Sequence, residues 1–443
     1  MIVLTVITIL LILFLAVSIG TLDRTPLKEY PEYTEMMQRL DSLNGMTIPA
    51  AKQNFSVGYS KQNLTPSFPT ATAGYGKRKG KPFTSVHDSI YVRTLVIDNG
   101  TTRVAIVTAD LLIIPPSVVK NLEGRLAKIG FSLNNTYLGA THTHNSIGNW
   151  GKGATRFLYG AYEDSVVNFI SGTIIESIEQ ASKNLLPAKL LSGAISIPEA
   201  VENRLIDGGP EDPLLRVIEV HRSDSSKLLL MSYTAHATCL YSADFSLSRD
   251  YPGKLVDDME QRGYDFTMFM AGAVGSHTSH APEAGTSCID WTTEKIVTEF
   301  EKSSRTLQPI SDSMIWMERV PLSLADPQIK LTDNLKARSW LFRAAFGEYP
   351  ACLTALRLGD LVMLGTPCDF SGEFDAAIDS FARKQNLRVI ITSFNGGYIG
   401  YVTPSKYYDV DHYETQLMNW YPPGNGEYIR ECLEKMIVAV SDK

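Results

Sequence analysis

The chain has 443 residues, a hydrophobic content of 44%, a charged content of 20% and a formal net charge of −7. This length and apolar content predict one large domain, or two ordinary ones, with a sizeable core, and they exclude general disorder. The charges are spread along the chain without the clustered basic face that nucleic-acid binding requires. We therefore expect no nucleic-acid partner, and nothing in the composition indicates an obligate protein partner.

The N-terminal 22 residues, MIVLTVITILLILFLAVSIGTL, contain no charge. At 1.5 Å per residue, such a segment spans a hydrocarbon core of about 30 Å. It lacks the basic start and the clear cleavage site of a signal peptide. We therefore expect a transmembrane anchor over residues 1–22, with a signal segment as the alternative. A linker with a short helix over residues 23–50 and a folded domain over 51–443 should follow.

The cysteines do not form a recognisable framework. They are few, odd in number and without a CxxC pair: Cys239, Cys288, Cys352, Cys368 and Cys432. Such a set is not typical of a disulfide scaffold or of a zinc ribbon.

Strand and helix patterns alternate from residue 89 onward. Continuous apolar runs bounded by turn residues predict strands, and apolar residues at helical spacing predict helices. The predicted strands are 89–99, 102–114, 135–144, 227–238, 266–276, 360–371 and 387–403, and the predicted helices are 115–130, 162–185 and 371–385. This pattern predicts an α/β fold, a layered mixed sheet covered by helices on both faces.

Polar side chains follow several of these strands at the point where each strand ends. In open α/β sheets, ligand sites form beyond the carboxyl ends of the strands, so these side chains should converge. The candidates are His142 and His144 in THTHNS, His236, Ser276 with His277, Asp369, and Tyr398 with Tyr401. Imidazole and carboxylate ligands favour zinc, although each histidine alone also fits an ordinary polar loop residue.

Short blocks in a fixed order give the chain a family resemblance. They include VGYSKQNLTP, VHDSIYVRTLVID, YLGATHTHNSIG, ENRLIDGG, YTAHATCL, LGTPCDFSGEF and NGGYIGYVTPSKYYDVDHYE, spread over residues 54–415. Together they resemble the neutral/alkaline non-lysosomal ceramidases, which are zinc amidases that cleave the amide bond of ceramide. The resemblance implies a zinc-dependent hydrolase domain over residues 51–443 that acts on ceramide or a related N-acyl lipid.

The resemblance also assigns roles to individual residues. It places zinc (Zn2+) on His142, His236, Asp369 and Tyr401, and it leaves His144 beside the metal for proton transfer. Aspartate is shorter than the glutamate of the family, so Glu373 remains an alternative ligand, as does Tyr398 in place of Tyr401.

The chain departs from the family in two places. The loop that carries the family's proposed catalytic serine reads GAVGSH here, with Gly275 at the serine position. Ser276 could act only if the loop is shifted by one residue, and His277 is a second candidate for moving a proton. We also expect no immunoglobulin-like C-terminal domain after residue 443. A ceramidase-like metal-binding protein with a carbohydrate, peptidoglycan-related or other non-lipid substrate, or with reduced catalysis, is therefore the alternative.

The predicted setting follows from the anchor and the substrate class. An enzyme of amphiphilic substrates benefits from a membrane tether, so we expect membrane attachment through the N-terminal segment and an extracytoplasmic domain. Arg24 and Lys28 follow the apolar segment, so the positive-inside rule does not itself favour this orientation. The glycine- and lysine-rich stretch TAGYGKRKGK lacks Walker spacing, and we expect a mobile loop near the site.

Overall fold

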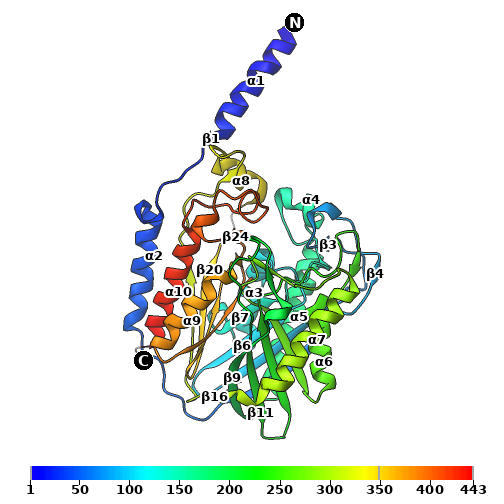
Figure 1. Ribbon diagram of the computed structural model, residues 1–443, viewed down its shortest axis with the longest axis vertical. Helices are drawn as coiled ribbons and strands as arrows, with labels where there is room; N and C mark the ends of the chain where they lie inside the picture. Colours follow the sequence, from blue (N-terminus) through cyan, green and yellow to red (C-terminus); the bar gives the residue numbers. More distant parts are fainter. Residues whose placement is uncertain (1, 348–349, 442–443) are drawn as a thin grey trace.

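Two β-sheets lie face to face between layers of helices (Figure 1). The computed structural model describes residues 2–347 and 350–441. The larger sheet has nine strands in the order β14-β12-β11-β9-β2-β5-β6-β7, with β16 paired to β9, and the smaller sheet has the order β17-β20-β21-β23. This arrangement confirms the predicted mixed α/β fold of sheets and helices. The prediction of one sheet with helices on both faces was wrong, because each sheet packs helices on one face and the other sheet on its opposite face.

The strands of the two sheets are mostly antiparallel, with three parallel pairs, β6–β7, β12–β14 and β21–β23. The larger sheet comprises β2 (Ser56–Asn63), β5 (Tyr91–Asp98), β6 (Arg103–Ala109), β7 (Thr136–Ala140), β9 (Leu186–Ser196), β11 (Leu214–Arg222), β12 (Lys227–Tyr233), β14 (Phe266–Ala271) and β16 (Gln308–Pro309). The smaller sheet comprises β17 (Ile315–Pro321), β20 (Cys352–Leu358), β21 (Leu361–Gly365) and β23 (Arg388–Thr392).

Alternating side chains on each strand supply two different cores. On β11, for example, Val217 packs towards the helices while Ile218 packs into the space between the sheets. Because side chains alternate with period two, each strand can bury both faces in this way. The near-continuous apolar runs in the sequence are a consequence of this double burial.

Three groups of helices cover the outer faces of the sheets. The helices α3 (Pro116–Leu126) and α5 (Asp164–Lys183) cover one half of the larger sheet, and α6 (Asp250–Gln261) and α7 (Thr286–Ser303) cover the other half. The smaller sheet is covered by α2 (Pro31–Asp41), α9 (Asp375–Lys384) and α10 (Asn425–Ser441), and α2 and α10 lie side by side in Figure 1. The short helix predicted within residues 23–50 is therefore α2, whereas α10 was not predicted.

The two edges of the larger sheet approach each other. The Thr108 hydroxyl on β6 donates a hydrogen bond to the Phe269 carbonyl on β14 at 2.8 Å, and the Met270 side chain lies against Gly139 on β7. The carboxyl ends of β7, β12 and β14 therefore meet at one place, although they lie at opposite ends of the strand order. This closure positions the candidate site.

Shorter elements form the loops around that place. They are β3 (Thr72–Ala73), β4 (Ser85–Val86), β8 (Ser146–Ile147), β10 (Glu202–Asn203), β13 (Ser246–Leu247), β15 (His277–Thr278), β18 (Ile329–Lys330), β22 (Asp369–Phe370), β24 (Tyr401–Val402), α4 (Arg156–Tyr159) and α8 (Ser339–Phe346). Among them, β22 and β24 pair in parallel, with Asp369 opposite Tyr401.

The expected transmembrane anchor is not supported. The apolar helix α1 (Ile2–Ser18) projects from the body of the molecule (Figure 1) and has 17 residues, or about 25 Å at 1.5 Å per residue. It ends because β1 (Ile19–Thr21) turns to pair with β19 (Leu335–Ala337), and the Trp340 indole donates to the Val17 carbonyl at 2.8 Å. Within residues 2–347 and 350–441, no helix combines the length and apolarity needed to cross a membrane.

One disulfide joins the loop after β12 to the start of α7. Cys239 and Cys288 are bonded across a separation of 49 residues, and both are buried. The scattered cysteine positions gave no indication of this pair. The remaining cysteines, Cys352, Cys368 and Cys432, are free and buried.

This disulfide should contribute to stability. Closing a loop of this length in the unfolded chain typically stabilises a protein by about 2–4 kcal/mol. We predict that dithiothreitol lowers the free energy of unfolding of the wild type by about this amount, measured by urea denaturation. Cys288→Ser should be equally destabilised and insensitive to the reductant. Equal stability of wild type and variant under oxidising conditions would contradict the prediction.

Candidate metal centre and its pocket

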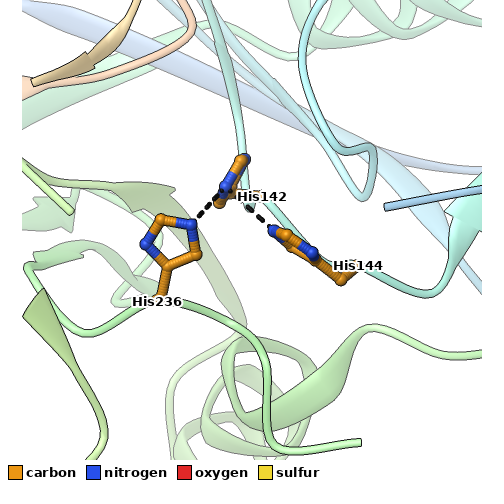
Figure 2. A group of neighbouring side chains, drawn as sticks. All are labelled: His142, His144 and His236. Carbon is orange, nitrogen blue, oxygen red and sulfur yellow. Dashed lines mark hydrogen bonds between the residues drawn. The ribbon is translucent and has the colours of Figure 1, made fainter. Parts of the chain in front are cut away.

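His142 lies directly beyond β7, at the centre of the candidate site (Figure 2). Its backbone adopts a left-handed conformation with φ of 62°, which is uncommon for a residue other than glycine and is concentrated at functional sites. The imidazole is stacked on Phe394, with ring centroids 3.9 Å apart, and its Nδ1 lies 2.6 Å from the Leu112 carbonyl. These contacts fix both the position and the orientation of the ring.

His236 reaches the same place from the loop after β12. Its Nδ1 lies 2.9 Å from the Val274 carbonyl, and its Nε2 lies 2.8 Å from Nε2 of His142. His144 approaches from the other side, with its Nε2 at 3.1 Å from the same His142 atom, as Figure 2 shows. The three histidines offer nitrogen atoms that all lie within 4.8 Å of one another, so this group could hold a metal ion.

The paired strands β22 and β24 bring oxygen ligands to the two histidines. Asp369 Oδ1 lies 3.5 Å from His142 Nε2 and 3.4 Å from His236 Nε2, and the Tyr401 hydroxyl lies 3.3 Å from His236 Nε2. The other carboxylate oxygen of Asp369 accepts a hydrogen bond from Tyr398 at 2.7 Å. Among the described residues, Oδ1 has no hydrogen-bond donor although it is buried.

Hydrogen bonding and burial together determine the charge state of the two inner histidines. A carbonyl oxygen can only accept, so Nδ1 of each ring carries the proton, and Nε2 of a neutral ring is left with a lone pair. Burial lowers the pKa of His142 to about 3 and the pKa of His236 well below its usual value, so both rings are neutral at neutral pH. The short contact between their Nε2 atoms therefore joins two acceptors.

These converging acceptors fit a cation. Two nitrogen lone pairs and the Asp369 oxygen Oδ1 point at one another in a buried space. Burial raises the pKa of Asp369 to about 7, so the ionised carboxylate is disfavoured by itself, and a positive charge between these atoms would stabilise it. In a tetrahedral zinc site with bonds of about 2.0–2.1 Å, neighbouring ligand atoms lie about 3.3 Å apart. The separations of 3.3, 3.4 and 3.5 Å involving Asp369 and Tyr401 match this edge length, and the two nitrogens are somewhat closer at 2.8 Å.

A large apolar pocket opens beside these residues. Its volume is about 770 Å³, and it is walled mainly by aromatic and aliphatic side chains, including Tyr75, Trp150, Leu158, Tyr159, Leu240, Tyr241, Phe346, Leu417 and Trp420. His144, Tyr398 and Tyr401 line it, whereas His142, His236 and Asp369 lie behind them. The polar groups are thus gathered at one part of an apolar cavity, as is typical of a small-molecule site.

Arg204 is a polar residue of the pocket that sequence reasoning did not single out. Its guanidinium donates to the Tyr401 hydroxyl at 2.9 Å and forms an ion pair with the buried Glu414 at 2.9 Å. Although burial lowers it, the pKa of Arg204 is raised overall by Tyr401, Glu414 and Asp369, so the side chain is a permanent cation. A single arginine forms no spaced motif, so the only sequence feature that could indicate a role for Arg204 is its position in the ENRLIDGG block.

The loop after β14 does not bring Ser276 and His277 into the pocket lining. His277 Nδ1 contacts the Ser276 hydroxyl at 2.9 Å, and its Nε2 accepts from the Asp212 backbone amide at 3.1 Å. The Ser276 hydroxyl also lies 2.8 Å from that of Ser371, and burial lowers the pKa of His277 to about 4. The pair therefore forms a buried network behind the loop.

The altered serine position has a steric cause. A Cβ at Gly275 would come within 2.4 Å of the Asp369 carbonyl oxygen, and the Gly275 amide donates to the Phe370 carbonyl at 2.7 Å. The loop therefore packs directly on the strand that carries Asp369, and this backbone leaves no room for a serine side chain. Glu373, the alternative carboxylate, is instead in contact with Asn203 and Lys406.

Comparisons with known proteins agree with the motifs. Residues 55–208 match the family model described as neutral/alkaline non-lysosomal ceramidase, N-terminal. The structure is similar to that of neutral ceramidase from Pseudomonas aeruginosa, with a TM-score of 0.75 and 18% identity over 88% of this chain and 75% of that chain. A structure titled "Ceramidase complexed with C2" is similar with the same TM-score and identity, over 88% of this chain and 76% of the other. The resemblance to the neutral/alkaline non-lysosomal ceramidases is therefore confirmed, through the family match over residues 55–208 and through a shared fold over most of the chain.

Proposed function

We propose that this protein is a zinc-dependent amide hydrolase that acts on ceramide or a related N-acyl lipid. The observation that carries the proposal is the convergence of His142 Nε2, His236 Nε2 and Asp369 Oδ1. The two ring nitrogens face each other as acceptors at 2.8 Å, and the buried Oδ1 has no hydrogen-bond partner among the described residues. With Tyr401 they form a donor set of two nitrogens and two oxygens, which suits zinc. His144 then remains as the imidazole that faces the substrate pocket.

The proposed ligand set uses Asp369 in preference to Glu373. Asp369 is opposite Tyr401 in the β22–β24 pair, and Tyr398 orients its carboxylate from the pocket side. The shorter aspartate side chain is compensated by the close packing of Gly275 against the Asp369 backbone. Tyr401 is preferred over Tyr398 because its hydroxyl lies nearer the histidine nitrogens, whereas the Tyr398 hydroxyl donates to Asp369.

The chemistry divides between the metal and the pocket residues. When bound, zinc would lower the pKa of a water molecule to about 7 and so supply a nucleophile at neutral pH. His144 lies beside His142 and lines the pocket, so it can accept the proton of the attacking water and pass it to the leaving amine. Arg204 and Tyr401 place a cation and a hydroxyl where they can stabilise negative charge on the amide oxygen.

The pocket supports an amphiphilic substrate. Its aromatic and aliphatic walls and its volume of about 770 Å³ suit an alkyl chain next to the scissile amide, and they limit the access of bulk water. Ser276 and His277 are proposed to support the loop that packs on Asp369. The Cys239–Cys288 disulfide, which borders this pocket, favours an oxidising and therefore extracytoplasmic compartment.

Metal content tests the ligand set. We predict about one zinc per chain in the wild type by elemental analysis, and almost none in His142→Ala, His236→Ala or Asp369→Asn, because each substitution removes a ligand. Glu373→Gln is the matched control for the carboxylate and should retain full zinc. Zinc loss in Glu373→Gln together with retention in Asp369→Asn would reverse the assignment.

Catalysis tests the role of His144. We predict that the wild type cleaves a fluorescent N-acyl sphingosine, and that His144→Ala keeps its zinc while its kcat falls by about 10²–10⁴-fold, as expected when a proton-transfer group is lost. His280→Ala is the control, because that histidine is 59% exposed and paired with Glu202 away from the pocket. Zinc loss in His144→Ala would instead make His144 a ligand, and a wild type that binds zinc but leaves the lipid intact would contradict the substrate class.

A further inference from the structure

The glycine- and lysine-rich segment near residue 76, expected to be a mobile loop, is anchored at the site by Arg78. This arginine ends the short 3₁₀ helix η3 (Gly76–Arg78) and is 1% exposed. No carboxylate forms an ion pair with it among the described residues. A buried guanidinium of this kind must satisfy its donors with neutral acceptors, and their arrangement shows what the residue joins.

The guanidinium bridges two segments that carry the candidate site. On one side it donates to the His144 carbonyl at 2.6 Å and to the Asn145 side-chain oxygen at 3.0 Å. On the other side it donates to the carbonyls of Ser242 at 3.1 Å and Tyr241 at 3.3 Å. The first segment follows β7, and the second continues the chain from His236 along the pocket wall.

The residues just before Arg78 complete the support of His144. Gly74 has a φ of 129°, and a Cβ there would come within 2.2 Å of the His144 carbonyl oxygen, so only glycine allows this approach. The Tyr75 ring meets the His144 ring edge to face at 5.0 Å, and its hydroxyl donates to the Leu240 carbonyl at 2.8 Å. The Arg78 guanidinium lies 4.7 Å from the centre of the Tyr75 ring.

The inner histidines are held by different contacts. His142 and His236 are oriented by the carbonyls of Leu112 and Val274, neither of which contacts Arg78. Loss of Arg78 should therefore release the His144 segment and the pocket wall while leaving the metal ligands in place.

We propose that Arg78 is a positioning residue that locks the segment of His144 to the pocket wall after His236, and so holds the His144 ring at the reacting centre. The inference rests on the proposed function, in which His144 moves a proton. Arginine is required because its planar guanidinium can donate hydrogen bonds to four acceptors at once. A lysine ammonium is a compact point charge with three donors.

Two variants test this role in the full chain loaded with zinc. Arg78→Gly and Arg78→Lys should each keep about one zinc per chain while kcat for a fluorescent N-acyl sphingosine falls by about 100-fold, the order of loss expected for a misplaced catalytic group. Millimolar guanidinium chloride should restore part of the kcat of Arg78→Gly by filling the vacated site. His144→Ala, which lacks the positioned group, should show no such rescue. Unchanged kcat in both variants, or no rescue of Arg78→Gly, would overturn the proposal.

Amide hydrogen exchange provides a readout that does not depend on activity. In Arg78→Lys, exchange should accelerate at residues 143–146 and 240–246 and stay unchanged in β12 and β14. Acceleration throughout the chain would mean a general loss of stability and would contradict a local positioning role. If the wild type cleaves no amide, the proposed function fails, and the exchange pattern still decides whether Arg78 joins the two segments.

Discussion

Two hydrogen bonds from histidine rings to backbone carbonyls determine what this site can be. Because Leu112 and Val274 accept from the Nδ1 atoms of His142 and His236, both rings must present lone pairs at Nε2, and those atoms lie only 2.8 Å apart. Burial keeps both rings neutral, so neither ring takes up a second proton that could form a hydrogen bond between the two Nε2 atoms. A cation between the two nitrogens would relieve this contact, and we propose that oxygen atoms of Asp369 and Tyr401 complete its ligand set.

The fold provides this convergence by closing the larger sheet on itself. His142 and His236 follow strands at opposite sides of the strand order, and they meet because β6 and β7 approach β14. The smaller sheet contributes Asp369 and Tyr401 through the extensions that follow β21 and β23. The apolar pocket then lies beside the cluster, and His144 and Arg204 line it, where we propose that they face the substrate. The proposed hydrolysis and the proposed binding of the alkyl chain are thus separated within one cavity.

Much of this arrangement could be predicted from particular residues. The apolar runs identified β5, β6, β7, β12, β14, β21 and β23, because strands buried on both faces have a distinctive pattern. Because polar residues follow these strands at their carboxyl ends, the sequence predicts that His142, His236 and Asp369 converge, as they do in the structure. By contrast, β9 and β11 were overlooked, and α10 was not recognised because it lies beyond the last block of the motifs.

Other features depend on contacts that no local pattern contains. Arg78 and Arg204 are single arginines that are recognised only by their partners. Arg78 contacts His144, which lies 66 residues away in the sequence, and Arg204 contacts Tyr401, which lies 197 residues away. The Cys239–Cys288 pair likewise requires α7 to pack beside the loop after β12. The transmembrane prediction is not supported, since the described apolar helix ends at Ser18, where β1 pairs with β19. Likewise, glycine at the family's serine position is explained by the close contact between Gly275 and the Asp369 backbone, which no local sequence pattern contains.

Anomalous diffraction from crystals of the zinc-loaded protein, measured on both sides of the zinc absorption edge, tests the central claim most directly. The proposed arrangement predicts a single strong peak between His142 Nε2, His236 Nε2, Asp369 Oδ1 and the Tyr401 hydroxyl, with His144 outside bonding distance. A peak bonded to His144 in place of Asp369, or no peak among these residues at full zinc loading, would contradict it.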